Sequence, residues 1–242
     1  MPSLMMTKTN LILASGQNMD FMIHGLIDFE LFGQTFWITT THVSILIVMV
    51  LIIAFACVLR ANLKGPDETP GMLQSFVEIA IEMLQNMVEG IMGSNAGKYM
   101  NYIGTIFVFI LLSNISGIFG LRPPTADFGV TLPLGIMTFL IVQYNNIKNN
   151  KFGAFTSLFE PVPFLFPINL IGEIATPFSL GLRLFGNIIS GTVIVALFYG
   201  MVPILFKIGV PAVLHAYFDL FSGCIQAYVF CMLTMVFINN KQ

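Results

Sequence analysis

Residues 169–190 read NLIGEIATPFSLGLRLFGNIIS, an apolar stretch interrupted by polar residues at regular intervals. The intervals are three or four residues, which is the spacing of one face of an α-helix. The stretch therefore predicts a helix with one narrow polar face and apolar surroundings elsewhere. The polar positions are Asn169, Glu173, Thr176, Ser179, Arg183, Asn187 and Ser190.

The helix predicted from this stretch is too long to cross a bilayer upright. Its apolar character extends from Phe164 to Tyr199, which is 36 residues and about 54 Å as one helix. The hydrocarbon layer of a membrane is only about 30 Å thick. We therefore expect this helix to be strongly tilted or broken, and Pro177 is a position where it can kink.

A second stretch near the end of the sequence repeats the pattern. His215, Asp219, Ser222 and Gln226 follow one another at steps of four, three and four residues, so they too share one helical face. A short connection, residues 201–210, would make the two helices antiparallel neighbours. Facing polar stripes would then form a polar seam through an apolar bundle.

The composition is that of a membrane protein. Of the 242 residues, 56% are hydrophobic and 9% are charged, against about a quarter charged in soluble domains. The formal net charge of −2 gives no basic surface for nucleic acid. The three cysteines lie in apolar runs without the spacing of a metal site. We expect the lipid bilayer as a partner, no nucleic acid, no metal, and no cofactor apart from a transported ion.

The whole chain is expected to form a single all-α membrane domain with about five crossing helices and one amphipathic interfacial helix. The first 19 residues lack the apolar core of a secretory signal, so insertion is expected to use the internal spans. Residues 71–92 repeat polar residues at helical spacing, which predicts the interfacial helix. The expected segments are an N-terminal outer segment (1–39), a first span (40–59), the interfacial helix (71–92), a membrane hairpin (100–146) and a long tilted hairpin (163–238).

The basic residues of the loops predict the orientation, because cytoplasmic loops are enriched in Lys and Arg. With the N-terminus outside, six bases lie on the cytoplasmic side and three outside. We therefore expect a multi-pass protein of the cell inner (plasma) membrane with its N-terminus outside and its C-terminus cytoplasmic. The six are Arg60, Lys64, Lys98, Lys148, Lys151 and Lys241, and the three are Lys8, Arg122 and Lys207.

Arg183 is costly within an apolar helix. An Arg near the bilayer centre costs at least about 2.5–3.5 kcal/mol on insertion scales. One explanation is a buried ion pair with Asp219 or Glu173, and the other is a carboxylate on another chain. An Arg cannot relay protons, because its pKa exceeds 12. Its expected use is therefore a fixed positive charge that separates two ion pathways.

Four segments resemble subunit a of the F-type ATP synthases. The resemblance covers the chain from about residue 40 onward. It implies a helical hairpin that lies nearly in the membrane plane against a rotating ring of c subunits, with a c-subunit carboxylate facing Arg183. A peripheral-stalk b subunit is a further implied partner. The four segments are SLGLRLFGNIISG (179–191), IQAYVFCMLTMVFI (225–238), PPTAD (123–127) and SNISGIFG (113–120).

The resemblance also implies roles for single residues. Arg183 matches the stator arginine, Asn187 and Gln226 match the amides beside it, and Glu173 matches an acid of the cytoplasmic half-channel. Two positions depart from a pattern common in proton-driven members. Thr192 stands where many have Glu, and Asp219 stands where many have His or another titratable group.

The expected function is that of an ion-translocating stator subunit with two half-channels and no catalytic site in this chain. The transported ion is H⁺ or Na⁺. The alternative is a self-contained secondary transporter, a class that usually shows internal repeats, and no repeat is found here. The expected ion-path residues are Arg183, Asn187, Gln226, Glu173, Asp219, His215, Thr192, Ser222, Ser190, Thr176 and Asn169.

Overall fold

The computed structural model describes residues 25–31, 34–63, 71–150, 163–201 and 210–241. It begins with two antiparallel strands, β1 (Gly25–Leu31) and β2 (Gln34–Thr39). This β-hairpin was not predicted from the sequence. It lies within the expected N-terminal outer segment, whose residues 1–24 are outside the described part of the chain.

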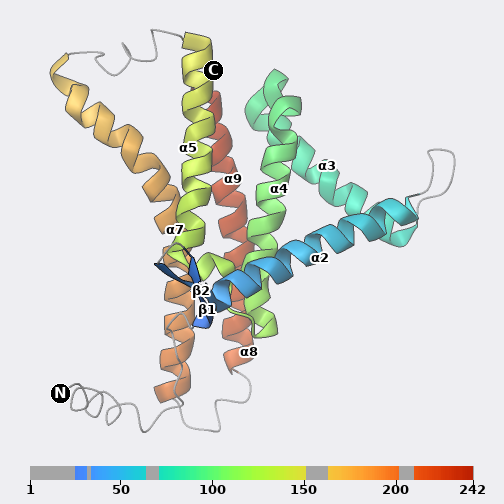
Figure 1. Cartoon of the computed structure of the whole chain (residues 1–242). Coiled ribbons are helices and arrows are strands. Elements are labelled where there is room, and N and C mark those ends of the chain that lie inside the picture. The colour runs from blue at the N-terminus through green and yellow to red at the C-terminus, as the bar shows by residue number, and fades with distance from the viewer. Residues whose placement is uncertain (1–24, 32–33, 64–70, 151–162, 202–209, 242) are drawn as a thin grey trace, which may run out of the picture.

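Helix α2 (Thr40–Asn62) follows β2 directly and leaves the other helices at a steep angle (Figure 1). At its start the side chains of Thr39 and His42 hydrogen-bond at 2.7 Å. Only three of its residues are buried, so most of its apolar surface faces outward. Its large exposed apolar residues are Val43, Leu46, Met49, Val50, Leu51, Ile53, Phe55 and Val58.

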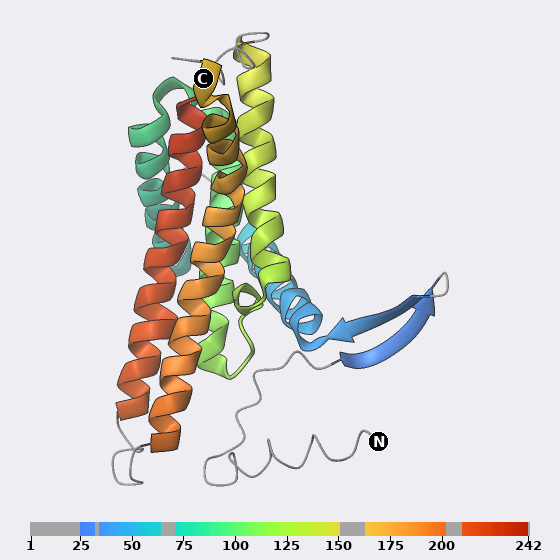
Figure 2. The same ribbon diagram turned by 90° about the vertical axis from the view of Figure 1, so that its left-hand side faces the viewer.

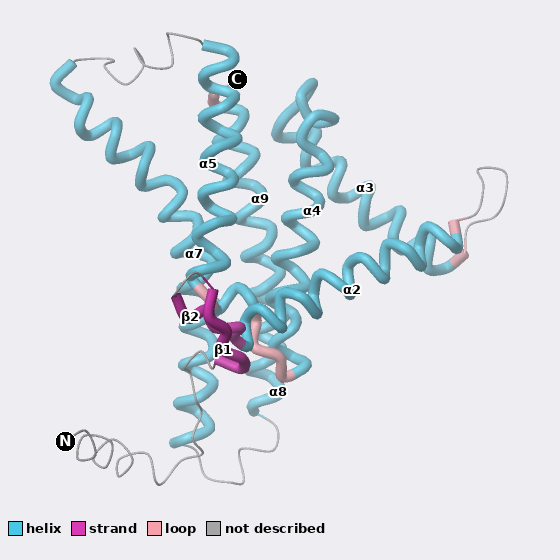
Figure 3. Tube along the Cα trace, in the orientation of Figure 1, coloured by secondary structure: helices cyan, strands magenta, loops and turns pink. Residues whose placement is uncertain are grey.

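Helices α3 (Met72–Met92) and α4 (Ala96–Ile115) meet at a sharp corner. The corner is the 3₁₀ turn Gly93–Asn95, and Gly93 has φ of 55°, a left-handed conformation that favours glycine. Two further 3₁₀ turns, Ser116–Phe119 (η2) and Pro124–Ala126 (η3), lead to α5 (Phe128–Asn150). In Figure 3, α4 and α5 lie along roughly the same axis, and the chain runs through them in opposite directions.

Helix α7 (Phe166–Met201) has 36 residues and is continuous, with Pro177 inside it. The long helix expected from the sequence is therefore unbroken, and Figure 1 shows that it changes direction along its length. The last helical segment consists of α8 (Val210–His215), the π-helical turn Ala216–Ser222 (η7) and α9 (Gly223–Asn239). It runs antiparallel beside α7 (Figure 2). The connection, residues 202–209, lies outside the described residues.

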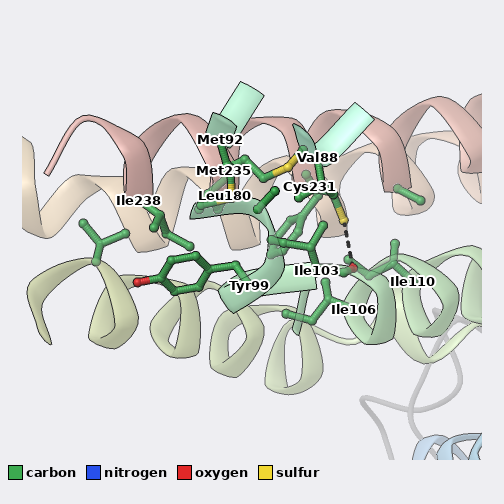
Figure 4. Packing of buried hydrophobic residues seen from close by; sticks show 14 of the residues in the cluster. Val88, Met92, Tyr99, Ile103, Ile106, Ile110, Leu180, Cys231, Met235 and Ile238 are labelled. Carbon is green, nitrogen blue, oxygen red and sulfur yellow. Dashed lines mark hydrogen bonds between the residues drawn. The ribbon is translucent and has the colours of Figure 1, made fainter. Parts of the chain in front are cut away.

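The hydrophobic core lies where α3, α4 and α9 meet, and Leu180 of α7 packs into it (Figure 4). Helices α5 and α7 approach each other closely because small residues face one another. A Cβ on Gly135 would collide with the Pro177 carbonyl oxygen, and one on Gly181 would lie 3.1 Å from the Leu132 Cα. This close packing fixes the position of α7, and so of its polar face, relative to α5.

The prediction of an all-α, polytopic membrane fold is confirmed. Among the described residues, five helical segments are long and apolar enough to cross a membrane. The polar run NNIKNN, residues 145–150, belongs to α5, and Asn145 and Asn146 are buried. Two oxygens of the run accept hydrogen bonds within the fold, Asn145 Oδ1 from the Tyr99 hydroxyl at 2.6 Å and Asn146 Oδ1 from Asn150 Nδ2 at 3.0 Å. The five segments are Thr40–Asn62, Met72–Phe119, Phe128–Asn150, Phe166–Phe198 and Val213–Asn239.

Candidate ion-translocation site

Arg183 lies near the middle of α7 and is exposed. It borders an open groove that Thr176 and Ser179 of the same helix also line, with Leu233 and Phe237 of α9 on the other side. Among the residues that the structure describes, none makes a hydrogen bond or an ion pair with Arg183. The guanidinium is thus an exposed charge on the polar face of α7, without a counter-ion in the described part of the chain.

The two carboxylates considered as partners of Arg183 are engaged elsewhere. Asp219 Oδ2 lies 2.8 Å from His215 Nδ1. Glu173 Oε1 accepts a hydrogen bond from Lys241 Nζ at 2.7 Å. The ion pair within the chain that would have made Arg183 a structural residue is therefore absent from the described part of the structure.

One hydrogen bond sets the register between α7 and the last helical segment. Asn187 Nδ2 donates to Ser222 Oγ at 2.9 Å. The two helices are antiparallel. Arg183, one turn before Asn187 on α7, is therefore level with Gln226, one turn after Ser222 on the last helical segment. Gln226 is 7% exposed, and its Nε2 atom has no partner among the described residues. A buried donor of this kind requires a water or a polar partner.

Asp219 lies in a π-helical turn, a feature that often occurs at functional sites. The carboxylate lies against Gly117 of the 3₁₀ turn η2, where an added Cβ would lie 3.3 Å from Asp219 Cγ. Nearby, Asn114 Nδ2 donates to the Gly223 carbonyl oxygen at 3.0 Å, and its Oδ1 accepts from Thr125 at 2.6 Å. These residues form a polar cluster on one side of Arg183.

Glu173 lies on the other side of Arg183, ten residues earlier on α7, which corresponds to about 15 Å along a helix. Gln143 Nε2 of α5 donates to its Oε2 at 3.0 Å. The carboxylate lines a cavity of about 130 Å³ between α5, α7 and the end of α9. The polar seam expected from the sequence therefore contains two separate polar clusters, one on each side of the arginine.

Several expected site residues bond within their own helix. The hydroxyls of Thr176, Ser190 and Thr192 donate to the carbonyl oxygens of Gly172, Asn187 and Ile189. Asn169 is half-buried near the start of α7 and has an interaction partner. Among the described residues, no group of three or more His, Cys, Asp or Glu side chains could hold a metal ion.

Four residues near the site were not singled out from the sequence as ion-path residues: Gln143, Lys241, Asn114 and Gly117. The sequence of α5 does contain a signal for its packed face: Thr131, Gly135 and Thr138 are small residues at helical spacing, and all three are buried. That pattern marks the face of α5 that packs on α7. The contact of Lys241 with Glu173, 68 residues away, has no local signal.

These observations define a class: a polytopic membrane protein whose antiparallel helix pair exposes an uncompensated arginine between two polar clusters. Comparison with known proteins identifies the family. The family model described as ATP synthase A chain matches residues 42–239. The chain therefore belongs to the ATP synthase A chain family, the F-type ATP synthase subunits a, whose members serve ion transport and ATP synthesis.

The chain is similar to subunits a from several bacteria over most of their length. It is 40% identical over 223 residues to the ATP synthase subunit a of Propionigenium modestum that is described as sodium ion specific, covering 85% of this chain and 75% of that protein. It is 34% identical over 205 residues to the subunit a of Moorella thermoacetica, covering 84% and 90%. It is 30% identical over 244 residues to that of Bacillus subtilis, covering 91% and 98%.

Proposed function

We propose that this chain is the stator subunit that passes H⁺ or Na⁺ to and from a rotating c ring through two half-channels, with Arg183 between them. The observation that carries this proposal is the exposed guanidinium without a counter-ion among the described residues. A charge left in hydrocarbon is costly. A c-subunit carboxylate facing α7 removes that cost, because it forms the ion pair that the described chain does not supply.

The two polar clusters suit two half-channels. On the outer side the path uses Asp219 and His215, with Asn187 and Ser222 leading toward Arg183. On the cytoplasmic side it uses the cavity beside Glu173, with Thr176 on the way to the arginine. Gln226 lies level with Arg183 and is placed to hold a water or the partner carboxylate. The hydroxyls of Thr192 and Ser190 and the amide of Asn169 complete the polar face.

A strong tilt of the α7–α9 hairpin follows if α2 crosses the membrane upright. Helix α2 is apolar on nearly every side, as a lipid-exposed helix is. Figures 1 and 2 both show it at a steep angle to α7 and α9. With α2 along the membrane normal, the α7–α9 hairpin is strongly tilted and faces the c ring over much of its length. Lipid and a peripheral-stalk b subunit then cover the exposed apolar sides of α2 and α3.

The first test separates a stator subunit from a self-contained transporter. Liposomes holding the purified chain alone are expected to show no ion flux driven by an ion gradient. The complete ATP synthase in the same kind of liposomes is expected to take up ions when ATP is added. Comparing this uptake with and without sodium in the medium identifies the transported ion. Gradient-driven flux through the isolated chain would contradict the proposal and favour a secondary transporter.

The second test concerns orientation in the cell membrane. Lys98 lies at the start of α4, Lys148 in the last turn of α5 and Lys241 just after α9, whereas Arg122 lies in the turn that joins the other ends of α4 and α5. We therefore expect the end that holds Lys241 to be cytoplasmic. After the three native cysteines are replaced, a cysteine introduced at Gln242 is expected to react with a membrane-impermeant maleimide only in inverted vesicles. Labelling of that cysteine in intact cells would reverse the orientation.

A further inference from the structure

The cavity beside Glu173 already contains a positive charge. Of the described residues that line it, Glu173 and Lys241 are the two charged ones. Lys241 Nζ lies 2.7 Å from Glu173 Oε1, and the two side chains are 30% and 23% exposed. The ammonium therefore reaches the carboxylate at the mouth of the cavity rather than extending into solvent.

The position of the ammonium is also one that a small cation would take. Hard cations prefer carboxylate, amide and hydroxyl oxygens as ligands. The cavity has the Glu173 carboxylate, the amide of Gln143 and the hydroxyl of Thr176 on its wall. Gln143 turns its NH₂ group toward Glu173 Oε2, so it holds the carboxylate in place and leaves Oε1 as the oxygen that a cation would bind. A volume of about 130 Å³ exceeds the space that one water needs.

We propose that Lys241 is a tethered cation that competes with the transported ion for the Glu173 carboxylate at the cytoplasmic mouth. This inference rests on the proposed function, because it assumes that ions pass through this cavity. An ion that enters from the cytoplasm displaces the ammonium. An ion that arrives from the ring is released when the ammonium returns. Lys241 is thus a positioning residue that keeps the site weakly occupied, so that ions leave as readily as they enter.

The test measures ion concentration dependence in the complete ATP synthase. In inverted vesicles the cytoplasmic face is outward, so the cation concentration at this face can be varied while ATP drives uptake. Replacing Lys241 with methionine removes the charge and keeps the apolar stem. We expect the half-saturating cation concentration to fall about two- to five-fold, which is the scale of partly exposed ion pairs. Lys241→Arg keeps a charge and is expected to retain the wild-type value.

Matched controls separate competition from a general charge effect. Lys148 lies at the same end of the bundle, is exposed, and contacts the Tyr144 ring rather than Glu173, so Lys148→Met is expected to leave the half-saturating concentration unchanged. The concentration dependence for ions supplied from the outer face during ATP synthesis is likewise expected to stay at the wild-type value in Lys241→Met. In a Glu173→Gln background, Lys241→Met is expected to cause no further shift.

Two results would overturn the inference. An unchanged half-saturating concentration in assembled Lys241→Met complexes would show that Lys241 only anchors this end of α9. Loss of assembly in both Lys241→Met and Lys241→Gln, with normal assembly of Lys241→Arg, would show the same. Either result leaves the half-channel proposal intact, because that proposal fails instead if complexes without the Arg183 charge still pump.

Discussion

Replacing Arg183 with alanine is expected to abolish both ATP synthesis and ATP-driven ion pumping in a complex that still assembles. The guanidinium is exposed on α7 and makes no hydrogen bond or ion pair with the residues that the structure describes. Its expected partner is a carboxylate on a moving c subunit. Without the positive charge, a loaded ring site can pass directly from one half-channel to the other. Membranes with the variant are then expected to leak the coupling ion.

The strength of the proposed ion pair is suited to a moving partner. Two unit charges about 4 Å apart interact by about 4 kcal/mol at an effective dielectric constant near 20. This Coulomb scale is several times thermal energy, so it is large enough to empty a ring site of its ion. It is also small enough to be exchanged for the next carboxylate as the ring turns.

Arg183→Lys is expected to rescue poorly, although it keeps a positive charge. Lysine lacks the planar fork that pairs with a carboxylate through two hydrogen bonds, and it can lose its proton in apolar surroundings. The measurements are the amount of assembled complex, the ATP synthesis rate and the passive ion leak for each variant. A purely structural Arg183 would behave oppositely: Arg183→Ala would prevent assembly, and removal of Asp219 as well would restore it.

The helical faces of the site could be predicted from the sequence because they depend on local spacing. The steps of three and four residues place Glu173, Arg183 and Asn187 on one side of α7 whatever the tertiary fold. The same holds for Asp219 and Ser222 on the last segment. The contact between Asn187 and Ser222 then agrees with two polar stripes that face each other, as expected for an antiparallel pair.

The partners of the two carboxylates could not be predicted in the same way. Which groups reach Glu173 depends on how far α9 extends past α7 and how deeply α5 packs against it. Lys241 and Gln143 are 68 and 30 residues away from Glu173. The π-helical turn around Asp219 also has no clear sequence signal, because it inserts one residue into a pattern that still reads as helical. The β-hairpin was not predicted, because residues 1–39 were assigned only to an N-terminal outer segment without a secondary structure.

Asp219→Asn is expected to slow ion-driven ATP synthesis by about tenfold or more while the complex assembles normally. Removing a positioned acid or base typically costs proton transfer 10²–10⁴-fold, and a neutral amide also binds a hard cation less strongly than a carboxylate does. Assembly should survive because asparagine has nearly the same shape and can still hydrogen-bond to His215, 2.8 Å from Asp219 in the wild-type structure.

A second acid-to-amide change provides the matched control for Asp219. Asp127 lies in the turn between α4 and α5, where its Oδ1 accepts from the Gly129 backbone N–H at 2.8 Å. Asparagine can accept the same bond, so Asp127→Asn removes a charge from that turn without removing a path residue. We expect it to synthesise ATP at close to the wild-type rate.

Wild-type rates in Asp219→Asn would show that Asp219 only orients His215. Equal slowing in both variants would point to surface charge rather than to a carboxylate in the ion path.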